Sequence, residues 1–283
     1  MTRHFILLFT GCMLISGISS AQTREQIDSI RVEYLKALKK LPPPADPNLM
    51  KYRSQLHVPD TLHFSRVRPY GPQASPAIFE TAYFKNTRTI EDSTNLDFYA
   101  IDVGEIDIET GKIIACDPIV MNAAEPFLQT FPTGTFPVQL AIATFNGDER
   151  VAFSRIYFSD KPVVRWEFAL NSGKRQLAID GDTLYGYGVN GGMGVFIDAK
   201  ANEAFSDLHK LDDNLWNAVF TDEMNRHDHN TWQYTLFEFQ THNLACFSTG
   251  LGDGYYGTYV GYDKEGQICR LLTDFGLVRW WKK

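Results

Sequence analysis

One stretch of the 283-residue chain decides how the rest must fold. It reads Ser248-Thr249-Gly250-Leu251-Gly252-Asp253-Gly254-Tyr255-Tyr256-Gly257-Thr258-Tyr259-Val260-Gly261-Tyr262-Asp263. Glycine reaches positive φ angles at little cost and lets the backbone approach its neighbours closely. The glycines at positions 250, 252 and 254 therefore predict a sharp, tightly packed turn. That turn would aim the short side chain of Asp253, which lies between two of them.

The residues that follow this turn predict a hairpin. Tyr255 to Tyr262 is rich enough in aromatic and β-branched residues to form a strand. The segment Asp263-Lys264-Glu265-Gly266 is a turn signal, and Gln267 to Phe275 reads as the return strand. The glycine-rich turn thus opens the last hairpin of the chain.

A second glycine-rich segment resembles the first. It reads Leu184-Tyr185-Gly186-Tyr187-Gly188-Val189-Asn190-Gly191-Gly192-Met193-Gly194-Val195-Phe196-Ile197-Asp198. Each segment holds five glycines, so together they hold ten of the 21 in the chain. This concentration favours two special loops that face each other. The simpler alternative is that both are ordinary tight corners between strands.

Composition and charge limit the class of protein. With 44% hydrophobic and 22% charged residues, the chain has globular proportions and can form a sizeable core. The formal net charge is −7 and the sequence has no basic block, which argues against nucleic-acid binding.

The first residues have the features of an export signal. Arg3 is a short basic region, Phe5 to Ser19 is an apolar run too short to span a membrane, and Ser19-Ser20-Ala21 fits a cleavage site. We therefore expect residues 1–21 to be a signal peptide and the protein to be periplasmic or extracellular. The alternative is a lipoprotein anchored through Cys12. No later apolar run is long enough for a transmembrane helix in the mature chain.

A helix and a proline linker are expected next, over residues 22–45. Thr23-Arg24-Glu25-Gln26 has the pattern of a capping box, and an apolar stripe with helical spacing follows it. Pro42-Pro43-Pro44 would end this helix. Residues 46–283 then form a single globular domain.

Alternating apolar residues predict strands through most of this domain. We expect an α+β fold, mostly antiparallel sheet, with the N-terminal helix and one or two helices inserted between strands. The expected strands cover 79–84, 96–103, a hairpin over 106–116, a meander of 137–145, 151–159 and 163–170, and later 232–239 and 243–247. The expected inserted helices cover 199–211 and 215–224.

Three cysteines follow the signal peptide, namely Cys116, Cys246 and Cys269. An odd number allows at most one internal disulfide. Cys246 and Cys269 are the more favoured pair because they lie in predicted strands that we expect to be neighbours. The alternative is three buried thiols that behave as small hydrophobic residues.

Several carboxylates are candidates for chemistry. Asp253 is the strongest, and Glu167 or Asp274 could pair with it as the acid and base of a hydrolase. A ligand-binding set would instead combine these five residues: Asn190, Asp198, Asp253, Tyr255 and Asp263. The structural alternative is that Asp263 and Asp274 bond backbone amides in turns and at strand ends.

The sequence does not indicate a particular metal or cofactor. His227 and His229 form a His-x-His pair without an evident third zinc ligand. Asp180-Gly181-Asp182 begins like a calcium loop but lacks the glutamate at its twelfth position. No nucleophile elbow or phosphate-binding loop is present.

Four segments in order carry a resemblance to a known family: 166–170, 185–198, 250–263 and 273–275. Over roughly Ile113 to Phe275 the chain resembles the bacterial family called domain of unknown function 4241. The resemblance implies no established activity. Members of that family usually carry an acidic residue at the position of Asn190, so any chemistry that needs this acid would be lost here.

Two functional hypotheses remain. The first is an exported binding or interaction module whose surface is built by the two glycine-rich loops, with a protein or a small ligand as its partner. The second is the hydrolase that uses Asp253 with Glu167 or Asp274. The spacing of these carboxylates distinguishes the two hypotheses.

Overall fold

The computed structural model describes residues 77–91 and 93–281. Within these residues, all strand pairs are antiparallel and a few helices lie between strands. This confirms the α+β class and the mostly antiparallel sheet. The expected signal peptide (1–21) and the N-terminal helix with its proline linker (22–45) lie outside the described residues.

The larger of two sheets has eight strands among the described residues. Its order is β1-β2-β4-β5-β12-β11-β6, and β7 also pairs with β11. The bounds are β1 Thr87–Glu91, β2 Thr94–Ile108, β4 Gly134–Phe145, β5 Asp148–Tyr157, β6 Arg165–Phe168, β7 Gly186–Val189, β11 Gly254–Tyr262 and β12 Ile268–Asp274.

The smaller sheet has the order β3-β8-β10-β9. Its strands are β3 Ile113–Cys116, β8 Met193–Asp198, β9 Tyr234–Phe239 and β10 His242–Ser248. The helices are α3 Ile78–Thr81, the 3₁₀ helix η1 Pro118–Ala123, α4 Ala199–Leu211, α5 Leu215–Asn217, the π-helical turn η2 Ala218–Glu223 and α6 Met224–Arg226.

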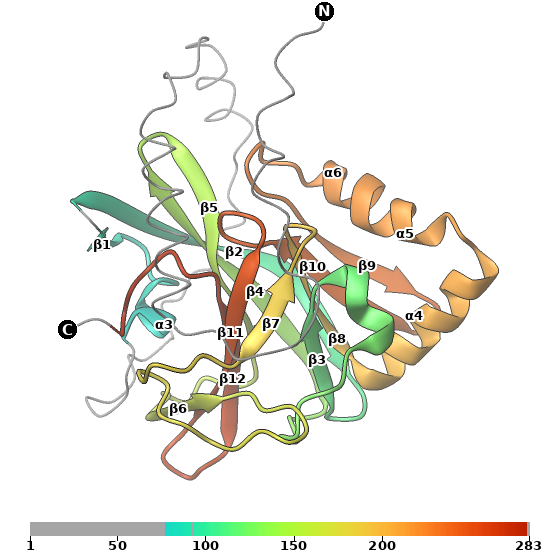
Figure 1. Cartoon of the computed structure of the whole chain (residues 1–283), viewed down its shortest axis with the longest axis horizontal. Coiled ribbons are helices and arrows are strands. Elements are labelled where there is room, and N and C mark those ends of the chain that lie inside the picture. The colour runs from blue at the N-terminus through green and yellow to red at the C-terminus, as the bar shows by residue number, and fades with distance from the viewer. Residues whose placement is uncertain (1–76, 92, 282–283) are drawn as a thin grey trace, which may run out of the picture.

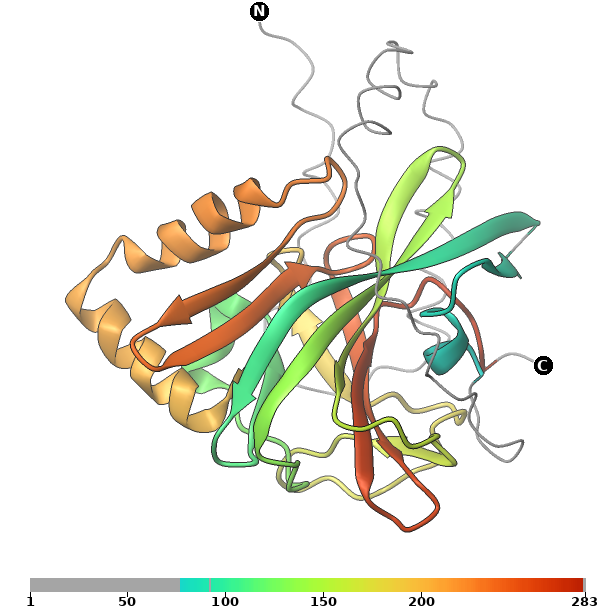
Figure 2. The same cartoon turned by 180° about the vertical axis from the view of Figure 1, so that it is seen from behind.

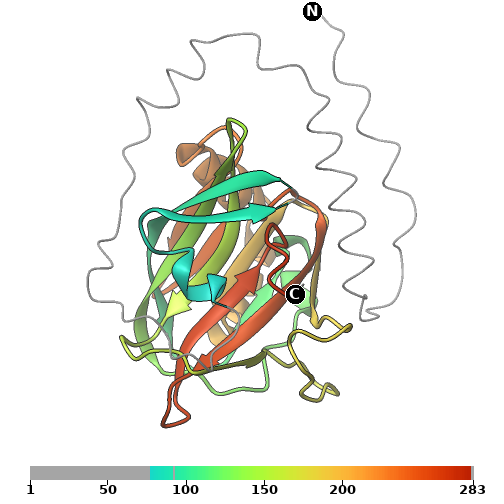
Figure 3. The same cartoon turned by 90° about the vertical axis from the view of Figure 1, so that its left-hand side faces the viewer.

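The elements form layers around three apolar clusters. The first cluster lies between the sheets, where Val138 and Leu271 of the large sheet meet Phe196 of the small one. Helices α4 to α6 cover the outer face of the small sheet (Figures 1 and 2). Helix α3 covers part of the outer face of the large sheet, on the side away from α4 to α6 (Figure 3).

Local sequence patterns predict several elements correctly. The Asn146-Gly147 turn joins β4 to β5, which confirms the first pair of strands in the expected meander, and the hairpin of β11 and β12 is also confirmed. Helix α4 has the predicted bounds because Asp198 caps its first turn by accepting a hydrogen bond from the Lys200 amide. The predicted second helix is present as the run α5, η2 and α6.

Three expectations about strands are wrong. Residues 79–84 do not form a strand, since α3 begins at Ile78 and places Phe79 and Tyr83 in the apolar cluster on the outer face of the large sheet. The predicted hairpin over 106–116 is absent, because β3 pairs with β8 in the other sheet. The meander does not continue into β6, which pairs with β11 while β5 pairs with β12.

The cysteines follow the alternative of three buried thiols, and no disulfide joins Cys246 to Cys269. Cys116, Cys246 and Cys269 are free and buried. Cys246 lies on β10 of the small sheet and Cys269 on β12 of the large one, so their strands are not neighbours. Cys116 and Cys246 both pair with Val195, one on each side of β8, which keeps them a strand apart.

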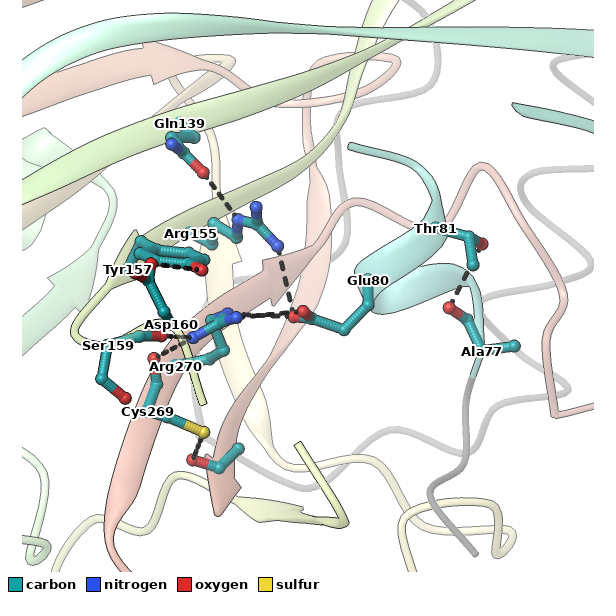
Figure 4. Close-up of polar contacts among 11 residues, drawn as sticks. Ala77, Glu80, Thr81, Gln139, Arg155, Tyr157, Ser159, Asp160, Cys269 and Arg270 are labelled. Atoms are coloured by element: carbon teal, nitrogen blue, oxygen red, sulfur yellow. Dashed lines mark hydrogen bonds and ion pairs between the residues drawn. The ribbon is translucent and has the colours of Figure 1, made fainter. Parts of the chain in front are cut away.

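A buried ionic cluster fastens α3 to the large sheet (Figure 4). Glu80 Oε1 accepts hydrogen bonds from Arg155 Nη1 at 3.2 Å and from Arg270 Nε at 3.1 Å, and Oε2 accepts from Arg270 Nη2 at 3.2 Å. All three side chains are fully buried. Burial lowers the pKa of the Arg155 guanidinium to about 10, although Glu80 opposes the shift. The Nε group of Arg155 donates to Gln139 Oε1 at 2.9 Å.

Replacing Glu80 tests the importance of this cluster. We expect Glu80→Ala to lower the free energy of unfolding by about 3–5 kcal/mol, because it leaves two guanidinium groups buried without their carboxylate. Urea denaturation of the full chain measures this loss. The matched control is Asp97→Ala, which breaks the exposed Arg88–Asp97 pair. Equal losses in the two variants would contradict a special role for the buried cluster.

The buried thiols give a second prediction. Burial raises the pKa of Cys116 and of Cys269 to about 12, and it raises the pKa of Cys246 as well. The thiolate is the reactive form of cysteine. Iodoacetamide at neutral pH should therefore label these three positions only after unfolding, as mapped by peptide mass spectrometry. Rapid labelling of any of them in the folded protein would contradict this.

Candidate functional site

The two glycine-rich segments are places where the chain crosses between the sheets. Between β7 and β8 it passes from the large sheet to the small one through residues 190–192. Between β10 and β11 it returns through residues 249–253. Val189 pairs with Gly254, and Met193 pairs with Ser248, so both crossovers lie at the same end of the sheets. We call residues 190–192 and 249–253 the crossover junction.

The two crossovers are hydrogen-bonded to each other. The Thr249 amide donates to the Gly192 carbonyl oxygen at 3.0 Å. Within the second crossover, Thr249 Oγ1 donates to the Gly252 carbonyl oxygen at 2.9 Å, and the hydroxyl of Tyr256 donates to the same oxygen at 2.7 Å. The expectation that the two glycine-rich segments face each other is therefore confirmed.

Two positions, in the second crossover and on β7, show why these segments require glycine. Gly252 has a φ of +105°, a region that other residues rarely adopt. At Gly186 the limit is space, because a Cβ there would lie 1.8 Å from the Tyr256 carbonyl oxygen across the β7–β11 ladder. The glycines thus allow both the turn and the close approach of strands beneath it.

A buried carboxylate holds the first crossover in place. Asp117, only 2% exposed, follows β3 and caps η1. Its Oδ2 accepts hydrogen bonds from the amides of Asn190 at 2.6 Å and Gly191 at 2.9 Å, and its Oδ1 accepts from the Ile119 amide at 2.8 Å. One side chain therefore joins η1 to the crossover.

Asp253 differs from Asp117 in being exposed. Partial burial raises the pKa of its carboxyl group, a hydrogen bond from the Gly192 amide lowers it, and the Asp117 carboxylate raises it further. Among the described residues, no cationic side chain forms an ion pair with Asp253. The junction therefore presents an accessible negative charge with fixed neighbours.

Two other candidates from the sequence hold turns. Asp198 is 1% exposed, and its Oδ2 accepts from the amides of Glu109 at 3.1 Å and Thr110 at 2.9 Å. Asp263 is 3% exposed and accepts from the amides of Glu265 and Gln267 in the β11–β12 turn. Their environments are those of carboxylates that stabilise local backbone.

The proposed ligand residues are only partly brought together. Asn190 is exposed and belongs to the junction with Asp253. Tyr255 is half-buried on β11, where its hydroxyl accepts a hydrogen bond from the Gly186 amide at 3.2 Å. The backbone contacts of Asp198 and Asp263 lie at other turns.

The two carboxylates of the hydrolase hypothesis hold other groups. Asp274 lies at the end of β12 opposite Gly257, and it accepts from the Gly276 amide and from Trp280 Nε1. Glu167 lies on β6 opposite Val260 and forms an ion pair with Arg165.

Sequence reasoning missed Asp117 as part of this site. Asp117-Pro118 directly follows the segment predicted as a strand up to Cys116, and Asp at an N-cap followed by Pro is typical of a helix start, so a local signal was present. Its bonds to Asn190 and Gly191 span more than 70 positions, so no local pattern could reveal them.

Two features are absent from the described part of the chain. Residues 77–91 and 93–281 contain no group of three or more His, Cys, Asp or Glu side chains placed to hold a metal ion. In the same residues, no helix combines the length and the apolar character needed to cross a membrane.

These features define a two-sheet α+β protein in which paired glycine-rich crossovers meet at one end. Residues 106–273 match the family described as "Protein of unknown function (DUF4241)". Because the match covers more than half of the chain, the protein belongs to this family. The resemblance inferred from sequence is thereby confirmed. No curated protein and no solved structure matches the chain significantly.

Asp117 provides a test of how the junction is held. In Asp117→Asn one carboxylate oxygen is replaced by an amide NH2 group, which cannot accept hydrogen bonds from main-chain amides. We expect a loss of about 1–3 kcal/mol in the free energy of unfolding. Hydrogen exchange should also become faster at the amides of Ile119, Asn190 and Gly191. The control Asp213→Asn changes an exposed acid, and unchanged exchange at the three amides in Asp117→Asn would contradict the assignment.

Proposed function

We propose that the protein is an exported binding module and that the crossover junction forms its recognition surface. The observation that supports this most is the exposed carboxylate of Asp253 on a pair of mutually bonded crossovers. Binding residues are commonly found on loops that a rigid scaffold holds in place. A fixed loop loses little conformational entropy when a partner binds.

The environments of the other carboxylates support the choice of Asp253. Asp117, Asp198, Asp263 and Asp274 are at most 5% exposed, and their oxygens accept hydrogen bonds from main-chain amides. Such groups stabilise turns and are not accessible to a partner. Asp253, by contrast, is an exposed carboxylate next to a glycine of positive φ, Gly252.

The proposal of export rests on the N-terminal sequence. Arg3, the apolar run from Phe5 to Ser19 and the small residues before Gln22 match a secretory signal. The periplasm or the cell exterior would then be the place where the partner is met. Anchoring through Cys12 would give the same exposure at a membrane surface.

Removing the Asp253 carboxylate tests the proposal. Full-length protein and the Asp253→Ala variant would each be immobilised and exposed to the exported fraction of the producing cell. We expect the partner to be retained by the native protein and its recovery to fall at least about tenfold with the variant, which corresponds to 1.4 kcal/mol of binding free energy. Quantitative mass spectrometry of the bound proteins and small molecules measures this recovery.

The control is Asp213→Ala, which removes an exposed acid from the turn between α4 and α5. It should retain the partner as the native protein does. Equal recovery with native protein and Asp253→Ala would overturn the proposal. If Asp253→Ala unfolded the protein in urea titrations, the residue would be structural and the proposal would also fail.

A further inference from the structure

Two exposed apolar residues follow Asp117 in η1, and the first of them, Ile119, lies against Gly191 of the crossover junction. Ile119 and Val120 of η1 are 56% and 46% exposed, while the next residue, Met121, is buried. A single exposed aliphatic side chain is ordinary, but two adjacent ones next to a constrained loop form a small apolar surface.

The apolar pair is physically joined to the first crossover. Asp117 accepts hydrogen bonds from the Ile119 amide and from the amides of Asn190 and Gly191. A Cβ at Gly191 would lie 3.1 Å from Ile119 Cδ1, so the Ile119 side chain packs over this glycine. The position of the apolar pair relative to the junction is therefore fixed by the same carboxylate that holds the junction.

The charge beside this apolar pair is negative. Asp253 is exposed, and the Asp117 carboxylate lies near enough to act on it electrostatically. In residues 77–91 and 93–281, Asp253 has no ion-pair partner of its own. Complementary charge across an interface fixes register and excludes wrong partners.

The glycines leave room for a partner to approach closely. A Cβ at Gly252 would meet no atom within 4 Å, and one at Gly192 would meet only the Cα of Gly252, at 3.8 Å. The surface above both residues is therefore open, and no side chain separates Ile119 from the second crossover at these positions. A main chain laid across the junction could place one side chain on the apolar pair and another at Asp253.

We propose that this surface binds a protein segment that presents a lysine or arginine close to an apolar side chain. The apolar side chain would pack on Ile119 and Val120, and the base would pair with Asp253. This inference rests on the proposed function, since it specifies the partner that the crossover junction recognises. A small ligand without a peptide backbone, or a partner without a base, is excluded by it.

A library of random linear peptides displayed on phage tests the inference with the full-length protein. We expect the selected peptides to share a Lys or Arg within a few positions of Leu, Ile, Val or Phe. Their dissociation constants should rise at least about tenfold with Asp253→Asn and with the double variant Ile119→Ser, Val120→Ser. Replacing the base of the peptide by Gln should have the same effect, and it requires no change in the protein.

Two matched controls test the position of the surface. Leu211→Ser removes an apolar side chain that is 85% exposed at the end of α4, and Asp213→Asn removes an exposed acid nearby. Both should leave the dissociation constants within about twofold. A reversed pair, Asp253→Lys with a peptide whose base is replaced by Glu, should recover binding because only direct pairing of the two charges predicts recovery.

The outcomes separate this inference from the broader proposal. Peptides that lose affinity with the Ile119 and Val120 variants but not with Asp253→Asn would overturn the basic partner and leave a binding surface at the junction. Sensitivity to Asp253→Asn alone would overturn the apolar part of the inference. Selection of no peptide, or of peptides insensitive to every junction variant, would overturn this inference, while the pull-down with Asp253→Ala independently decides the proposed function.

Discussion

The structure depends on how main-chain amides are satisfied where the chain leaves one sheet for the other. A strand in a ladder finds its hydrogen bonds in its neighbours, but a crossover does not, and a buried amide without a partner costs about 1–3 kcal/mol. Two buried carboxylates supply acceptors at these places. Asp117 serves the crossover from β7 to β8, and Asp198 serves the turn from β2 to β3 while also capping α4. Main-chain amides therefore have acceptors at both ends of β8, where the chain passes between the two sheets.

A different solution holds the outer face of the large sheet. There a carboxylate from the four-residue helix α3 meets two arginines from adjacent strands, and the three side chains are fully buried. Buried ion pairs seldom add net stability over well-packed apolar groups, because desolvation offsets their attraction. Their geometry is demanding, however, and in the observed placement of α3 one carboxylate accepts from both guanidinium groups. We infer that Glu80 determines where α3 docks, while Phe79 and Tyr83 provide the apolar contact.

The expectations that are correct concern interactions between residues close in sequence, and those that are wrong concern interactions between residues far apart in sequence. The β4–β5 and β11–β12 hairpins are specified by turn residues next to their strands, and α4 by its cap and apolar stripe, so each can be predicted locally. The segment 106–116 contains a turn signal as well, but its second half pairs with β8, about 80 residues away. For residues 79–84 the apolar pattern predicts a strand, whereas the structure has a helix from Ile78 to Thr81, and it buries Phe79 and Glu80 against distant strands. The glycine-rich segments could be located from sequence, but their meeting at Asp117 could not.

The position of Asn190 connects the family pattern to this junction. Asn190 contributes its main-chain amide to Asp117, and its side chain is exposed. Any residue other than proline can make that bond, so an acidic residue at this position, which the family resemblance leads us to expect, would leave the crossover intact. The difference therefore affects the surface and its charge, and not the fold. Asp253 then carries the exposed negative charge of this chain's junction, on a loop whose glycines leave its carboxylate accessible. The buried Asp117 holds the first crossover in place, and under the proposed function the exposed Asp253 selects the charge of the partner.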